Sequence, residues 1–321
     1  MTMIDQILEI LGWWLAATLF ASFSSALIYP FFCRLLAQSG ASLRASARLA
    51  FVAAAPLAAA LAVALITQSS LASLMVPAHC HADQCGVHAP AYPESSLLLI
   101  GLAAVSSLVV GGLFMVLLWA LYRAYQRLSV LLLISQRSAE GYRTIDSEEV
   151  LACCVGLWRP EILLSRGLIE RLQPHELAVV LEHERAHVTR QDNLRSLAMS
   201  WATLFWPTAV RHRVLHDYRA DTEQACDLMA ARAGAGEAQV AAVIRKLDGL
   251  SAGSRSDRGS GFACDDAAAR INALQYPGPR QGQERRGLYT IVSGLALNWC
   301  LLVYCLTALS HPVIEWLGAG W

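Results

Sequence analysis

Four long stretches of the chain are almost entirely apolar, and each is long enough to cross a bilayer as a helix, which takes about 20 residues. In residue numbers they are 11–32, 49–66, 97–121 and 288–309. Asp5 and Glu9 precede the first stretch, which lacks the basic start and the cleavage site of a signal peptide, so we expect a retained anchor. The pattern predicts a mainly α-helical membrane protein with four transmembrane helices.

Arginines are distributed unevenly between the segments that join these stretches. They occur in the first hairpin, after the third stretch and before the fourth, as Arg34, Arg44, Arg48, Arg123, Arg127, Arg280, Arg285 and Arg286. The loop 67–96, the N-terminus and the tail 310–321 contain neither Lys nor Arg. Because basic residues favour the cytoplasmic side, we expect both termini and this loop outside, and residues 123–286 inside as a cytosolic domain. The chain would divide into 1–122, 123–286 and 287–321.

Apolar residues within the middle segment recur at helical spacing. Leu177, Val180 and Leu181 follow the i, i+3, i+4 pattern, and Pro174 suits a first helical position, so a helix is predicted from there to about Arg190. The stretch contains the sequence His-Glu-x-x-His.

His183 and His187 would therefore project from one face of this helix, one turn apart. Two imidazoles so placed can occupy adjacent corners of a zinc tetrahedron, with Glu184 beside the open position as general base. The alternative interpretation of this pattern is a solvated helix face.

A second helical run, "DYRADTEQACDLMAAR", offers a third ligand. Glu223 and Asp227 are four residues apart, so Glu223 could complete a two-His, one-Glu site while Asp227 orients a ligand imidazole. Asp221 is the competing ligand, and a solvated acidic face is again the alternative.

Composition and charge narrow the class of protein. Hydrophobic residues make up 55% of the 321 residues and charged residues only 16%, against roughly a quarter in soluble chains. The formal net charge is +0, so no basic field indicates direct binding of nucleic acid. The nine cysteines show no C-x-x-C spacing, which argues against a structural zinc ribbon.

The outer loop contains a separate cluster, "HCHADQCGVH". Its members are Cys80, Cys85, His79, His81 and His88. On an oxidising side of the membrane the two cysteines would form a disulfide, and the alternative is a soft-metal or redox sensor.

The sequence "GLWRPEILLSRGLIERLQPHELAVVLEHERAHVTRQDN", followed by "DTEQACD" and "ARINAL", resembles membrane-bound zinc peptidases of the BlaR1/MecR1 type, family M56. Matching positions are Gly156, Pro160, Ile162, His183, Glu184, His187, Arg190, Asp192, Glu223, Cys226 and Asp227. The resemblance covers roughly residues 120–310 and implies a gluzincin-like α+β domain with a small sheet.

The resemblance also assigns roles to these positions. It implies one zinc ion per chain on His183, His187 and Glu223, with Glu184 as base. Asp227, Asp192 and Arg190 would support the ligands. It further implies that the strand with Gly156, Pro160 and Ile162 lies beside the cleft, where an extended substrate could add as a further strand.

The BlaR1/MecR1-type proteins that sense antibiotics have one feature that is missing from this sequence. In those proteins a penicillin-binding domain follows the fourth span, whereas here residues 310–321 follow it. Lys246 is the only lysine, and Val243 stands three residues before it, so there is no Ser-x-x-Lys sequence. We therefore expect no β-lactam sensing by acylation within this chain.

We predict a multi-pass zinc endopeptidase of the bacterial inner membrane that responds to an external input by cleaving a cytosolic repressor of the BlaI type, or itself. The rival functions are a constitutive quality-control protease similar to family M48, and a non-catalytic receptor that keeps zinc for structure. A homodimer is compatible with the sequence.

Overall fold

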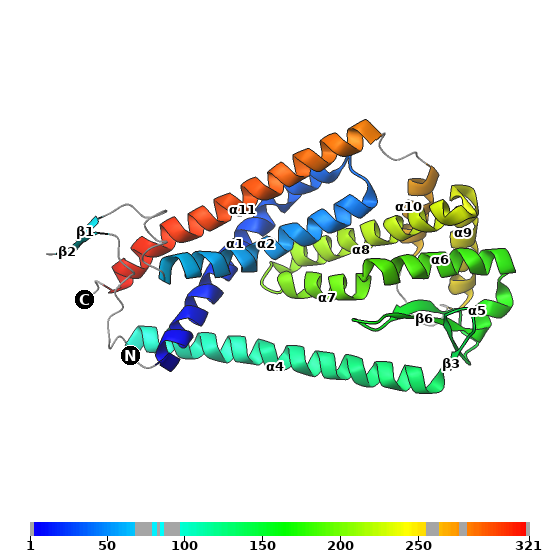
Figure 1. Ribbon diagram of the computed structural model, residues 1–321, viewed down its shortest axis with the longest axis horizontal. Helices are drawn as coiled ribbons and strands as arrows, with labels where there is room; N and C mark the ends of the chain where they lie inside the picture. The colour runs from blue at the N-terminus through cyan, green and yellow to red at the C-terminus, as the bar shows by residue number, and fades with distance from the viewer. Residues whose placement is uncertain are drawn as a thin grey trace.

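The computed structural model describes residues 3–67, 79–81, 84–86, 97–254, 263–275 and 281–318, and most of these residues are helical (Figure 1). The helices are α1 (Met3–Leu36), α2 (Ala41–Thr67), α4 (Leu97–Ile134), α5 (Arg166–Arg171), α6 (Pro174–Arg190), α7 (Asp192–Ala202), α8 (Thr208–Ala230), η1 (Ala231–Ala235), α9 (Glu237–Ser254), α10 (Ala263–Gln275) and α11 (Gln281–Gly318). The strands are β1 (His79–His81), β2 (Gln84–Gly86), β3 (Gln136–Arg137), β4 (Arg143–Ile145), β5 (Ala152–Val155) and β6 (Glu161–Ser165).

Four of these helices are long and apolar enough to cross a membrane, as the sequence predicts. The candidate spans are Ile10–Leu36, Ala41–Thr67, Ala104–Ile134 and Gly287–Ala308. The third helix continues past residue 121, where the expected span ends, because the apolar sequence resumes after Arg127 and holds helical structure to Ile134.

Helices α1, α2 and α11 pack together at one end of the molecule (Figure 1). Alanines of α2, among them Ala55, Ala58 and Ala59, are fully buried against Leu302 and Leu306 of α11. Small side chains let helix backbones approach closely, which is how helices associate in lipid. Helix α4 contacts α1 near its start and leaves most of its apolar surface exposed, as expected of a face that lipid covers (Figure 1).

The helices of the second half form a layer that continues from this bundle (Figure 1). Tyr29 of α1 and Phe51 of α2 pack edge-on against the ring of Trp206, which is buried between α7 and α8. Because this aromatic contact joins the membrane hairpin to the chain between α7 and α8, the two parts share one apolar core.

A small mixed sheet lies beside α6, in the order β3-β4-β6-β5. Strands β4 and β6 are parallel, and the other two pairs are antiparallel. The sequence-based placement of the substrate strand needs correction here. Ile162 lies on β6, which is paired on both sides, and Gly156 and Pro160 belong to the β5–β6 connection; the edge strand beside α6 is β5.

Candidate metal centre

Helix α6 presents two histidines to the same point. It begins with Pro174 and a capping box between Gln173 and Glu176, and it therefore has a fixed start. One turn separates His183 from His187, and their Nε2 atoms lie 3.1 Å apart. Both side chains are largely buried, so their orientation is set by packing.

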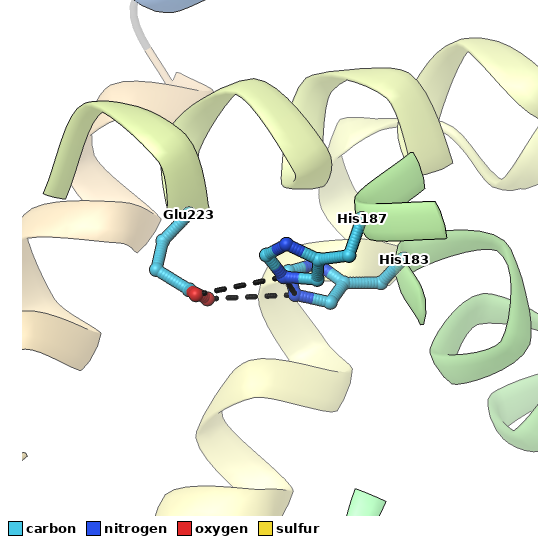
Figure 2. A group of neighbouring side chains, drawn as sticks. All are labelled: His183, His187 and Glu223. Atoms are coloured by element: carbon cyan, nitrogen blue, oxygen red, sulfur yellow. Dashed lines mark hydrogen bonds and ion pairs between the residues drawn. The ribbon is translucent and has the colours of Figure 1, made fainter. Parts of the chain in front are cut away.

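A carboxylate from α8 converges on the same point, as Figure 2 shows. Glu223 Oε2 lies 3.4 Å from His183 Nε2, and Glu223 Oε1 lies 3.5 Å from His187 Nε2. Ligand atoms about 2.0–2.1 Å from a zinc ion at tetrahedral angles are about 3.3 Å from one another. The three separations match this value, so the donor set fits a tetrahedral divalent ion with one position left open.

Each histidine is held from behind by a different aspartate. Asp227 Oδ1 lies 2.9 Å from His183 Nδ1, and Asp192 Oδ2 lies 2.9 Å from His187 Nδ1. When Nδ1 of an imidazole donates to a carboxylate, the lone pair of Nε2 is free for a metal. The geometry therefore directs both Nε2 atoms at the proposed ion.

The position of Asp192 follows from a local turn. Gln191 adopts a left-handed conformation with φ 54°, which ends α6 and starts α7. This reversal returns Asp192 to the side of His187, where Arg190 Nε donates to its carboxylate at 3.2 Å. The thiol of Cys226 also faces this arrangement, 3.4 Å from His187 Nδ1 and so on the side of the ring away from the metal-directed nitrogen.

Arg270 of α10 is a site residue whose role the sequence did not predict. Its Nε and Nη2 both bond to the carboxylate of Asp227 at 2.7 Å, and its Nη1 lies 3.1 Å from Glu223 Oε2. No periodicity signals this contact, because α10 and α8 are far apart in the chain.

The pKa values of the site follow from these contacts. Burial lowers the pKa of His183, but its hydrogen bonds to Asp227 and Glu223 outweigh burial and raise the pKa to about 9. Burial raises the pKa of Glu223, yet the hydrogen bond to His183 and the charges of His183 and Arg270 bring it down to about 2. Because its pKa is low, Glu223 carries a negative charge at neutral pH, and this charge favours the binding of a cation at the site.

Glu184 lines a cavity of about 460 Å³ beside the three converging side chains. Burial raises the pKa of its carboxyl, against the opposing charges of the two histidines. Cys153 and Cys154 of β5 and Asn193 of α7 line the same cavity. Asn193 Nδ2 donates to the carbonyl oxygens of Cys154 and Gly156, each at 2.9 Å, and so ties the end of the edge strand to the helix that follows the motif.

Asp221, the competing ligand, is engaged elsewhere. Its buried carboxylate pairs with Arg44 and Arg48 of α2 rather than with a histidine. Among the described residues, the groups that could hold a metal with His187 are Glu223 with His183, or Asp192 with Cys226.

Only the backbone of part of the outer-loop cluster is described. Strands β1 and β2 pair antiparallel with Cys80 opposite Cys85, and His79 and His81 lie on β1. Their side chains and the whole of His88 lie outside the described residues, so a disulfide or sensor there stays a prediction.

One of three comparisons with known proteins identifies a family for this chain. A family model described as BlaR1 peptidase M56 matches residues 42–233, a range that includes α2, the motif helix and Glu223. No curated protein and no solved structure gives a significant match.

Proposed function

The chain belongs to the BlaR1 peptidase M56 family, a family of metallopeptidases, and on this premise we propose that it is a membrane-embedded zinc endopeptidase. The observation that carries the proposal is the convergence of His183, His187 and Glu223 at the spacing of a zinc tetrahedron. Asp227 and Asp192 would set the tautomers of the two histidines, and Arg270 would hold Glu223 and Asp227 in place.

Zinc, when bound, supplies a Lewis acid that polarises a peptide carbonyl and makes water acidic enough to react near neutral pH. Glu184 would accept a proton on its carboxylate and pass it to the amine of the leaving peptide. Its burial favours this role, because a raised pKa makes the carboxylate a stronger base.

The substrate would bind as an extended peptide along the edge of β5. A strand that is paired on both sides cannot accept a further strand, whereas an edge strand offers free backbone groups on its open side. Strand β5 is the edge strand that lies against α6, and three of its residues line the cavity. The two hydrogen bonds from Asn193 would hold the end of this strand in a fixed position beside the proposed zinc ligands.

We place the active site on the cytosolic side of a bacterial inner membrane, with both termini outside, from the distribution of arginines. The favoured role is signal transduction, in which an input across the membrane licenses cleavage of a cytosolic repressor of the BlaI type, or of the chain itself. The direct contacts of α2 with α8, the helix of Glu223, support such a route.

The experiment compares Glu184→Gln with Glu182→Gln in the full chain held in nanodiscs. Glu182 lies on the same helix, is half-buried and pairs with Arg185, so it is a matched control. We expect about one zinc per chain in all three proteins, and cleavage of a BlaI-type repressor only by the wild type and Glu182→Gln.

Other outcomes would select a rival function. Cleavage of unfolded proteins but not of the repressor would favour quality control. Signalling in cells that survives Glu184→Gln would favour a receptor that keeps zinc for structure.

A further inference from the structure

A second cavity, of about 1030 Å³, lies between the start of α2, the end of α8 and the start of α11. It is separate from the zinc cleft and shares none of its lining residues. We call it the α2–α8–α11 pocket. The residues that matter for its chemistry are Leu43, Ser46, Met229, Arg232, Arg285 and Leu288.

Two guanidinium groups in this pocket have no carboxylate partner in the described part of the chain. Arg232 is exposed on η1, directly after α8, and Arg285 is exposed on α11. Nearby Arg44 and Arg48 differ, because both form ion pairs with the buried carboxylate of Asp221, and Arg48 also pairs with Asp217. Because both side chains are exposed, an anion that enters the pocket can reach their charges.

The rest of the lining is largely apolar. Leu43, Met229 and Leu288 contribute aliphatic surface, and Ser46 adds an exposed hydroxyl. A small, fully hydrated anion would gain nothing from such walls, whereas a ligand with a charged head and a hydrocarbon body would use both parts.

The pocket also lies where two of the candidate membrane spans begin. The span of α2 begins at Ala41 and that of α11 begins at Gly287, and both starts belong to the pocket region. Cationic side chains at the end of a span meet lipid headgroups, while the apolar residues beside them meet acyl chains.

We propose that the α2–α8–α11 pocket binds an anionic glycerophospholipid, with its phosphate between Arg232 and Arg285 and its first acyl carbons against Leu43 and Leu288. Arginine forms paired hydrogen bonds with phosphate oxygens, so two arginines suit this headgroup. Bound lipid would brace the start of α2 against α8.

The pocket wall is linked to the zinc site. Ser42, which lines the pocket, accepts a hydrogen bond of 2.9 Å from Arg190, the arginine that holds Asp192 behind His187. A single hydrogen bond, from Arg190 to Ser42, thus connects the proposed lipid site to the residues that orient His187.

The test is a titration of the purified full chain with phosphatidylglycerol or phosphatidylcholine, read by native mass spectrometry. We expect one phosphatidylglycerol to be retained most tightly, and Arg232→Gln with Arg285→Gln to weaken its binding about thirtyfold. The control is Arg123→Gln with Arg127→Gln on α4, which removes the same charge from another candidate span and should leave that binding unchanged.

A second variant, Ser46→Phe, fills the pocket without changing its charge and should also weaken retention of the lipid. Three results would overturn the proposal. The α4 control could lose as much phosphatidylglycerol binding as the double arginine variant, or the wild type could retain phosphatidylcholine as tightly as phosphatidylglycerol. Tight binding of phosphatidylglycerol could also survive in both pocket variants. Displacement of the lipid by millimolar inorganic phosphate would also overturn it, because the site would then recognise free phosphate.

Discussion

Arg44 of α2 donates from its Nε to Asp221 Oδ1 of α8 at 2.6 Å, two residues before Glu223 on the same helix. The other oxygen of Asp221 accepts from Arg48 Nε at 2.8 Å, and Arg44 also donates to Gln224. A membrane helix is thereby fixed on both sides of a proposed zinc ligand, so a displacement of α2 would reach Glu223 directly.

Removing the carboxylate of Asp221 should destabilise the protein by about 3 kcal/mol or more, because two largely buried guanidiniums would lose their main counter-ion. The measurement is the free energy of unfolding of Asp221→Ala in detergent. Asp146→Ala removes half of an exposed ion pair with Arg166 and should cost about 1 kcal/mol or less. Equal costs would mean that the contact with α2 does not stabilise the protein.

Asp227→Asn should weaken zinc binding about 10–100-fold, because the amide no longer holds the Nδ1 proton of His183 as a carboxylate does. Competition with a chelator of known affinity measures this change. The control is Asp146→Asn, which removes the same charge from an exposed position and should leave the zinc affinity unchanged. An unchanged affinity in Asp227→Asn would show that the tautomer of His183 is set by something else.

The affinity for zinc should depend on pH through His183. In protein stripped of metal its pKa is about 9, so below that pH a proton must leave before the metal binds. The apparent affinity should rise by about tenfold per pH unit from about pH 7 and level off near 9.

The stability of the stripped protein should change in the opposite direction. A raised pKa contributes stability that is complete below the ordinary value near 6.5 and is lost as the pH rises through about 9. Chelator competition and thermal unfolding across this pH range measure the two effects. A zinc affinity that does not change across this pH range would contradict the assignment of a competing proton to His183.

Asn193→Ala should impair substrate binding more than chemistry. The variant loses both hydrogen bonds to the carbonyls of Cys154 and Gly156, so the edge strand β5 is held less firmly beside α6. We expect KM for a repressor substrate to rise about tenfold while kcat and zinc content stay close to wild type. A fall in kcat alone would place Asn193 in the chemical step instead.

Much of this arrangement could be predicted from the sequence, where the signal is local. Apolar length predicted the four long helices, and the i, i+4 spacing predicted that His183 and His187 share a face of α6. Glu223 emerged as a ligand candidate because its helix carries a matching carboxylate one turn later.

Contacts between distant segments could not be predicted in this way. Arg270 meets Asp227 from another helix, and Arg44 meets Asp221 from the membrane hairpin. Neither contact leaves a periodic trace in the sequence. For the same reason the sequence could not show that the strand of Ile162 is paired on both sides, because strand order is a tertiary property: β4 pairs with β6 and leaves β5 at the edge.

Zinc X-ray absorption of the full chain tests the central claim most directly. The account predicts two imidazole nitrogens and one or two further oxygen ligands, all at about 2.0–2.2 Å, from His183, His187, Glu223 and solvent. A sulfur ligand at about 2.3 Å would instead place the ion on Cys226, with His187 and Asp192, and would contradict the proposed centre.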